Sequence, residues 1–325
     1  MSRLSQRAQS QPAISNRREA LRTERLFFKR YCDWYSLGME KTLTIEGMEF
    51  VQMPRVRVGG PTDPVEVYRG EGIFLRLGTA KSLQGHLDTH RKMQESGFPV
   101  ANILKTGTIE DKIYFIEEGL GRSLMELFTE DCKSAGSITD DHFVILTDLT
   151  RRHLEAQFRS VQEARYTEAF ATGIHLHIVC EELPEWSAAI KRRFDEAIAN
   201  TAVYPFVLSH GDYNVANILE KGEIDLEDAM LAPIGFDPVS AIVTTEMYPL
   251  TGDYESLSRY QFSDSQRAAF YALCDSVFQS HGIPPLSARA HDFAFFRTVW
   301  LVARMHKWPK TQQYRYDLFI KRYLN

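Results

Sequence analysis

The sequence predicts an α+β fold with a strand-rich first part and a mostly helical second part. Strand-like apolar segments follow one another between Arg55 and Leu124, separated by turns that contain Gly and Pro. From Thr139 onward, apolar residues recur at helical spacing. One polar loop, Ser209 to Asn217, interrupts the helices and lies between two short strand-like segments. A chain of 325 residues is long enough for two such lobes.

The first 40 residues form a separate basic arm. Met1 to Arg30 holds eight basic residues and two acids. Ser2 to Ser15 has the composition of a disordered segment, whereas Arg17 to Trp34 has helical spacing. Two interpretations remain open: a solvated tail with a helix on the small lobe, or an arm that binds an anion or a partner.

The strand-rich part contains two features suited to phosphate. Arg55 to Tyr68 predicts a strand, a turn and a second strand, and Gly59 and Gly60 in the turn would let backbone N–H groups approach a phosphate. A Gly-Gly-Pro hairpin without any ligand is equally natural. Next, Gly72 to Gly78 predicts an apolar strand with Arg76 at its centre, which is either a phosphate partner or a solvated side chain. Lys81 is a second candidate for that cation.

A helix and two strands complete the predicted small lobe. The helix spans Leu83 to Glu95, and the strands lie within Phe98 to Leu104 and Ile113 to Leu124. The expected domains are therefore 1–40, the arm; 41–118, the strand-rich small lobe; and 119–325, the mostly helical large lobe.

The second part is predicted to be helical. His175, His177 and Cys180 lie in an apolar segment without a second ligand pair, so we interpret them as core or pocket-wall residues rather than as metal ligands. Helices are predicted at Thr139 to Ser160, Glu182 to Asn200, Ser263 to Gly282, Pro285 to Met305 and Gln312 to Leu324.

The polar loop carries the chemistry. Asp212 and Asn217 are spaced as in the kinase pattern H-R-D-x-x-x-x-N, and Asp225 follows after one short strand-like return. Amide and carboxylate oxygens are ligands suited to Mg²⁺, and a carboxylate beside a hydroxyl can orient it and accept its proton. The alternative is a plain polar turn, since Gly, Asp and Asn are ordinary loop residues. The flanking strands favour a phosphoryl-transfer site.

Ser209 to Ala229, SHGDYNVANILEKGEIDLEDA, resembles the signature of the aminoglycoside phosphotransferase and choline kinase superfamily, H-G-D-x-x-x-x-N followed by I-D-x-E. The resemblance implies a bilobal protein-kinase-like fold: a small lobe with an antiparallel sheet and one main helix, and a large, mostly helical lobe. It also implies phosphorylation of a small-molecule hydroxyl by ATP, with Asp212 as catalytic base and with Asn217 and Asp225 as Mg²⁺ ligands.

The same resemblance assigns roles outside the loop. Gly59 and Gly60 would form a shortened glycine loop, Arg76 would contact phosphates, and backbone groups of Glu117, Glu118 and Gly119 would contact adenine. His210 and Asp237 would hold the shape of the catalytic loop. The sequence departs from the family pattern where the helix should supply an acid for Arg76: His86 occupies that place, and Asp88 is the nearest acid.

Composition fits an enzyme of the cytoplasm. Apolar residues make up 44% and aromatic residues 12% of the chain, and the net charge of −5 argues against nucleic acid as the main partner. The longest apolar run, Phe293 to Met305, is interrupted by Arg297 and Arg304 and is too short to cross a membrane, and the amino terminus lacks a signal-peptide core. Four scattered cysteines suggest reduced thiols, at Cys32, Cys132, Cys180 and Cys274.

Three functions follow from these observations. The leading one is a small-molecule kinase with ATP and Mg²⁺ as cofactors and a hydroxylated, amine-bearing or sugar-like metabolite as acceptor. The others are a protein kinase, disfavoured because no Ala-Pro-Glu segment follows Asp225, and a nucleotide-binding pseudokinase, suggested by the missing helix acid. A cationic acceptor would suit the acids and aromatic residues of the second part, which are equally ordinary surface acids and core rings. These are Glu227, Asp228, Glu246, Asp253, Glu255, Tyr248, Tyr254, Tyr260, Trp300 and Trp308.

Overall fold

A computed structural model describes residues 41–58, 65–247, 260–304 and 309–324. By its internal contacts the chain divides into two compact units, residues 1–52 and 53–325. In the first unit, β1 (Thr42–Ile45) pairs antiparallel with the start of β2 (Met48–Val58). Glu46 and Gly47 join them, and both have positive φ angles, as a two-residue hairpin turn requires. Gly59, Gly60 and the basic arm, 1–40, lie outside the described residues.

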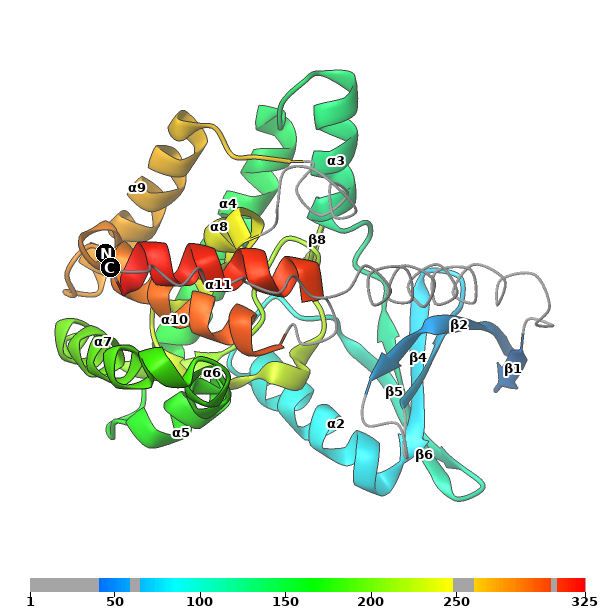
Figure 1. Cartoon of the computed structure of the whole chain (residues 1–325). Coiled ribbons are helices and arrows are strands. Elements are labelled where there is room, and N and C mark those ends of the chain that lie inside the picture. The colour runs from blue at the N-terminus through cyan, green and yellow to red at the C-terminus, as the bar shows by residue number, and fades with distance from the viewer. Residues whose placement is uncertain (1–40, 59–64, 248–259, 305–308, 325) are drawn as a thin grey trace, which may run out of the picture. The chain divides into compact units, whose positions relative to one another are not determined.

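The second unit begins with an antiparallel sheet and one long helix. The strands β3 (Val65–Arg69), β4 (Ile73–Thr79), β6 (Lys112–Glu118) and β5 (Ile103–Ile109) are hydrogen-bonded in the order β3-β4-β6-β5. The helix α2 (Ala80–Glu95) lies along this sheet (Figure 1). It starts where Thr79 caps it by accepting a hydrogen bond from the amide of Ser82. The predicted strand at Arg76 and the predicted helix after it are confirmed.

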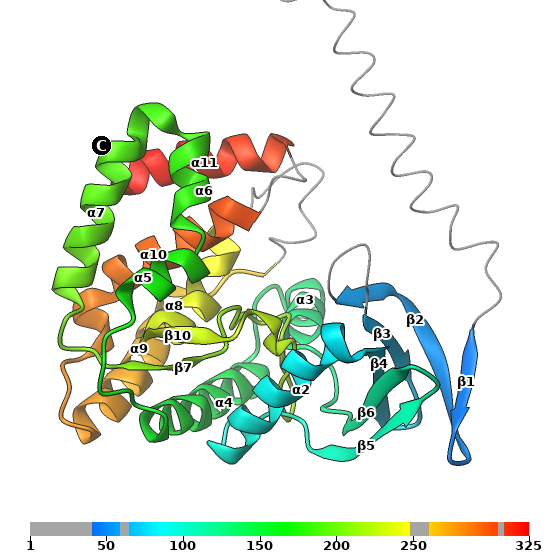
Figure 2. The ribbon, with the colours of Figure 1, turned by 90° about the horizontal axis from the view of Figure 1, so that it is seen from below.

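The rest of the second unit is mostly helical and surrounds a short two-stranded ribbon, β7 (Phe206–Ser209) and β10 (Met230–Pro233) (Figure 2). This arrangement confirms the α+β, bilobal, protein-kinase-like architecture. The helices are α3 (Leu124–Ser134), α4 (Asp140–Arg159), α5 (Thr167–Gly173), α6 (Leu176–Glu182), α7 (Ser187–Asn200), α8 (Phe236–Val243), α9 (Asp264–Ser280), α10 (Ala290–Arg304) and α11 (Pro309–Tyr323).

Two predicted helices begin later than expected, in each case because a 3₁₀ turn precedes them. Pro184 opens the turn Pro184–Trp186 before α7, and the turn Leu286–Arg289 follows Pro285 before α10. Proline has a fixed φ near −65° and no amide hydrogen, so it suits the first residue of a turn or helix, and here it marks the start of each 3₁₀ turn. Helix α9 begins as predicted, where Ser263 and Gln266 form a capping box.

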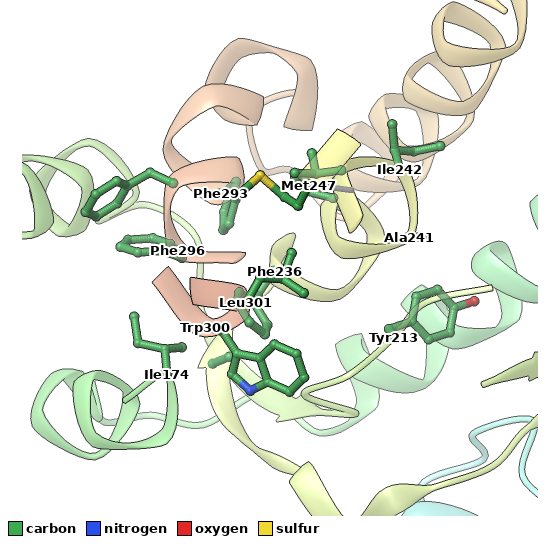
Figure 3. Packing of buried hydrophobic residues seen from close by; sticks show 14 of the residues in the cluster. Ile174, Tyr213, Phe236, Ala241, Ile242, Met247, Phe293, Phe296, Trp300 and Leu301 are labelled. Atoms are coloured by element: carbon green, nitrogen blue, oxygen red, sulfur yellow. The ribbon is translucent and has the colours of Figure 1, made fainter. Parts of the chain in front are cut away.

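Helix α10 crosses the hydrophobic core of the helical lobe and packs against α8. Figure 3 shows Phe293, Phe296 and Trp300 of α10 gathered near Phe236 of α8. The apolar run Phe293 to Met305 was visible in the sequence. Its composition is explained by the burial of α10 on nearly all sides. Among the described residues, no helix combines the length and the apolar character needed to span a bilayer.

Candidate active site

The β7–β10 ribbon brings the polar loop and Asp225 together. After β7 the chain runs through the loop 210–217, turns back through β8 (Ile218–Leu219) and β9 (Gly222–Glu223), and reaches Asp225. The strand β10 then returns antiparallel to β7, with Met230 opposite Ser209. The amide of Ile224 donates to the carbonyl oxygen of Asn217 at 2.9 Å, so the segment before Asp225 is tied to the end of the loop.

Gly211 is required where the loop passes the Asp225 segment. Its φ angle is +81°, and a Cβ atom there would lie 1.9 Å from the carbonyl oxygen of Asp228. Any side chain would therefore collide with backbone, in a conformation that L-residues rarely adopt. The glycine that distinguishes the H-G-D motif permits this close approach.

The carboxylate of Asp212 is held by three donors. Its Oδ1 atom accepts from Nη2 of Arg297 at 2.5 Å and from Nδ2 of Asn214 at 2.8 Å. Its Oδ2 atom accepts from Nδ2 of Asn217 at 3.1 Å. The side chain of Asp212 is 20% exposed, whereas that of Arg297 is fully buried. Arg297 lies 85 positions further along the chain, and we did not predict its role.

Asn217 and Asp225 present oxygen atoms suited to a cation. Nδ2 of Asn217 donates to the backbone and the side chain of Asp212, which leaves its Oδ1 atom without a partner among the described residues. The carboxylate of Asp225 likewise makes no hydrogen bond or ion pair within the described part of the chain, and its φ angle is +68°. Partial burial raises the pKa of this carboxyl, although Arg76 and His210 oppose the shift.

This donor set fits Mg²⁺ bound together with a phosphate. One amide oxygen and one carboxylate are hard ligands, and magnesium ordinarily completes its coordination with substrate phosphate and water. Within the described ranges, three or more His, Cys, Asp and Glu side chains nowhere gather as a metal site of their own. Asn217 and Asp225 therefore offer two of the oxygen ligands that such a cation would need.

Asp237 and His210 both form hydrogen bonds with backbone amides of the loop 210–217. Asp237, buried on α8, accepts from the amide of His210 at 2.7 Å and from the amide of Gly211 at 3.1 Å. Nε2 of His210 lies 2.8 Å from the carbonyl oxygen of Ile224, and Nδ1 accepts from the amide of Asp212 at 3.3 Å. This pattern corresponds to an imidazole protonated at Nε2, which links the loop to Ile224, the residue before Asp225.

A buried histidine that we did not predict, His153, connects Asp237 with Glu223, which precedes the Asp225 segment. His153 of α4 lies 2.8 Å from Glu223 through Nδ1 and 3.1 Å from Asp237 through Nε2. Burial alone would lower the pKa of His153, but the two carboxylates outweigh it and raise the pKa to about 9. Gln157, one turn later, also donates to Asp237, at 2.9 Å. Two polar side chains four residues apart on an otherwise apolar helix face were the sequence signal for this network.

Arg76 obtains its acid from a strand rather than from a helix. Nε of Arg76 donates to Glu117 on the neighbouring strand β6 at 2.8 Å; Glu117 is buried, and the side chain of Arg76 is 12% exposed. Asp88, the acid nearest to the expected helix position, is exposed and accepts from Gln84 instead. Burial would lower the pKa of Arg76, but Glu117, with Asp225 and Glu227, raises it. Arg76, Glu117 and Asp225 line one narrow pocket, to which α2 contributes His86 and His90.

The predicted adenine-binding stretch is partly engaged within the protein. The amide of Glu118 donates to the carbonyl oxygen of Asn102 at 3.1 Å, and the amide of Gly119 donates to that of Gly72 at 2.7 Å. The Glu118 side chain also accepts from Asn102, at 2.8 Å. An adenine placed here would therefore meet carbonyl oxygens, or amides further along the chain.

The acids and aromatic residues considered for a cationic acceptor are largely engaged as well. Arg297 and Arg304 stack over the ring of Trp300, at 4.0 Å and 4.6 Å from its centroid. Arg304 also pairs with Asp228.

The other candidates are mostly occupied or undescribed. Loss of hydration, with Asp225 and Asp228 nearby, raises the pKa of Glu227 to about 7. Glu246 pairs with Arg267 and Arg322, Tyr260 is buried beside Phe128 and Phe262, and Tyr248, Asp253, Tyr254, Glu255 and Trp308 lie outside the described residues.

Comparisons with known proteins agree on a family and a fold. The model of the Phosphotransferase enzyme family (APH) matches residues 67–271. An ethanolamine kinase from Plasmodium vivax aligns with a TM-score of 0.55 at 12% identity, over 85% of this chain and 84% of that one. A choline/ethanolamine kinase family protein from Mesorhizobium loti aligns with a TM-score of 0.51 at 12% identity, over 82% and 86%. A thermostable mutant of aminoglycoside phosphotransferase APH(4)-Ia aligns with a TM-score of 0.50 at 12% identity, over 86% and 95%. A search of curated proteins finds no match.

Proposed function

Because this chain belongs to the Phosphotransferase enzyme family, whose model covers more than half of it, we propose that it is a small-molecule kinase that transfers the γ-phosphoryl group of ATP to a hydroxyl group. The observation that carries the proposal is the grouping around Asp212. Two oxygen ligands without partners in the described part of the chain, on Asn217 and Asp225, accompany a carboxylate that is held by fixed donors. A phosphoryl-transfer centre needs such a set.

Each group has a definite task in the proposed reaction. Asp212 orients the acceptor hydroxyl and takes its proton as the acceptor oxygen bonds to the γ-phosphorus. The bond between that phosphorus and the bridging oxygen breaks, and ADP leaves with the electron pair. Asn217 and Asp225 would hold Mg²⁺, which supplies positive charge next to the phosphoryl oxygens.

Arg76 is the proposed phosphate contact of the small lobe. Its Nε atom is used by Glu117, while its Nη atoms have no hydrogen-bond partner in the described part of the chain. A guanidinium held at one edge can present its other edge to phosphate. The Arg76–Glu117 pair also removes the main reason to consider a pseudokinase, because the acid missing from the helix is supplied by the strand.

The acceptor is proposed to be a small hydroxylated molecule, either amine-bearing or sugar-like. Ethanolamine, choline and an aminoglycoside cover these chemistries, and the similar structures named above are described as acting on such compounds. Trp300 is not proposed as an aromatic wall for a cationic group, since two guanidinium groups already stack over its ring.

The test is ATP turnover in the presence of Mg²⁺ with each of these acceptors, for the wild type and for Asp212→Asn. We expect acceptor-dependent ADP release that falls by about 10²- to 10⁴-fold in the variant, because the general base is lost. Asp275→Asn is the matched control: that carboxylate only caps the turn before α10 through Ser287, so turnover should be retained. Failure of every acceptor to raise turnover, together with label transfer to a protein substrate, would favour a protein kinase instead.

A further inference from the structure

Arg297 is the charged residue at the centre of the apolar helix α10. Its side chain is fully buried, and each of its three nitrogen atoms has a partner. Nη2 donates to Oδ1 of Asp212 at 2.5 Å, Nη1 to the carbonyl oxygen of Gly211 at 3.2 Å, and Nε to Oγ1 of Thr244 at 3.1 Å. A guanidinium bonded on all its edges cannot rotate without losing several hydrogen bonds.

Packing also fixes the plane of this guanidinium. Trp300 lies one turn further along α10, with the Arg297 Cζ atom 4.0 Å from its ring centroid. Trp300 is itself held in the core beside Phe236 (Figure 3). Removing a guanidinium from water is costly unless an acid compensates it. Asp212 is the acid that pairs with it in the described residues, so the charge of this core arginine is directed at the proposed catalytic base.

The hydrogen bonds distinguish the two oxygen atoms of Asp212. Oδ1 accepts from both Arg297 and Asn214, which uses the two in-plane lone pairs of a carboxylate oxygen. Within the described residues, Oδ2 accepts from Asn217 alone. One lone pair of Oδ2 is therefore left for a further donor.

We propose that Arg297 is a positioning residue: it clamps Oδ1 of Asp212 so that Oδ2 is the atom that meets the acceptor hydroxyl and takes its proton. This inference rests on the proposed function of Asp212 and specifies which oxygen atom acts. The clamp comes from the core of the helical lobe, so it is in place before any acceptor binds. Preorganisation of this kind is what a transfer reaction with little covalent chemistry requires of the protein.

Charged groups on other elements also act on Asp212. Asp225 lies on the side of the proposed magnesium ligands, and Arg304 lies further along α10. Arg304 is partly exposed and pairs with Asp228, whereas the Arg297 contact is buried and direct. Loss of Arg297 therefore removes the nearest positive charge, while Asp225 and Arg304 remain.

The experiment compares Arg297→Ala with Arg315→Ala, using hydrolysis of Mg-ATP with water as the acceptor and any acceptor found in the screen. Arg315 is an equally buried arginine, on α11, that donates to the carbonyl oxygens of Met247 and Leu301. For Arg297→Ala we expect kcat to fall on the order of 100-fold, as for a misplaced reacting group, with the KM for ATP nearly unchanged. Millimolar methylguanidinium should restore part of the loss.

Rescue and thermal stability separate positioning from general damage. Methylguanidinium should restore kcat in Arg297→Ala but not raise kcat in the wild type. Arg315→Ala should lower Tm but keep the wild-type kcat. The proposal is overturned if folded Arg297→Ala keeps kcat within about threefold of wild type, or if both arginine variants lose kcat equally without rescue.

Two further measurements decide the remaining cases. If Arg297→Ala does not fold, Thr244→Val is used instead, because it removes the acceptor of Arg297 Nε with little change of shape. A several-fold loss of kcat in Thr244→Val at unchanged Tm supports the clamp. A wild-type kcat in Thr244→Val overturns it. If the wild type shows no turnover at all, the proposed function fails. A crystal structure of Arg297→Ala then tests the clamp alone: a rotated Asp212 carboxylate supports it, and an unmoved one contradicts it.

Discussion

At the scale of single residues, the candidate site depends on one glycine and on a few side chains held by distant parts of the chain. The positive φ of Gly211 and its approach to the Asp228 carbonyl explain why the loop has no side chain before Asp212. The neighbouring amides of His210 and Gly211 both donate to Asp237. The loop conformation is therefore set by backbone contacts as much as by the side chains that define its motif.

Gly211→Ala should lower the free energy of unfolding by more than about 3 kcal/mol and abolish turnover, because the new methyl group meets backbone that must shift. Gly136→Ala is the control: Gly136 also has a positive φ, +78°, but apart from Gly136 and its two chain neighbours no atom of the described residues lies within 4 Å of the place that its new methyl group would take. It should lose only about 1 kcal/mol, the cost of the φ angle alone. Chemical denaturation measures both. Equal losses would show that the contact with Asp228 does not matter.

Residues of the loop were predictable from sequence, whereas their partners were not. The order of Asp212, Asn217 and Asp225 along the chain reflects one local hairpin, which short-range patterns reveal. Arg297 and Glu117 are contributed by remote elements, and their contacts depend on which face of a helix or strand meets the loop. A sequence signal for Arg297 did exist: an arginine within an apolar helical run predicts a buried acid partner, although not which acid.

At the scale of elements, α4 and α8 support the ribbon that carries the site. Helix α4 contributes His153 and Gln157, and α8 contributes Asp237. His153 bridges Asp237, which binds the loop, and Glu223, which precedes Asp225. One imidazolium thus connects the two halves of the proposed site.

This network predicts how stability depends on pH. The folded state holds the pKa of His153 at about 9, above the reference value of about 6.5 in an unfolded chain. The stabilisation is therefore fully present below about pH 6.5 and is lost as the pH rises through about 9. The free energy of unfolding should fall by a few kcal/mol over that interval in the wild type. Denaturant titrations at several pH values measure it.

His153→Gln should lower stability at pH 6 and flatten this dependence, because glutamine carries no proton to lose. His281→Gln is the control, since His281 forms a partly exposed pair with Glu155 at the other face of α4. It should keep the wild-type slope. A His153→Gln protein with an unchanged slope would mean that the imidazole is not charged in the folded state.

Element boundaries show what local patterns miss. The helices α2, α4 and α9 were predicted closely, because caps and apolar spacing are local signals. The β1–β2 hairpin and the short helices α5, α6 and α8 were not, because their formation depends on tertiary packing rather than on propensity. Helix α8 is fully buried and too short for a periodic pattern to stand out.

At the scale of the whole molecule, the chain has the bilobal fold of the phosphotransferase family. The sequence predicted this architecture because the catalytic-loop motif is nearly specific to it. The bounds 1–40, 41–118 and 119–325, and a cytoplasmic location, stay predictions. So do the roles of Gly59 and Gly60, which lie outside the described residues.

The central claim is that the loop 210–217 and the segment that carries Asp225 together hold a nucleotide through a divalent cation. Calorimetric titration with a non-hydrolysable ATP analogue, with Mg²⁺ and then with EDTA, tests it most directly in the wild type and in Asp225→Asn. The account predicts binding that weakens at least about tenfold in EDTA and that no longer responds to Mg²⁺ in the variant. Equal affinity with and without Mg²⁺ in the wild type, or an unchanged metal response in Asp225→Asn, would contradict it.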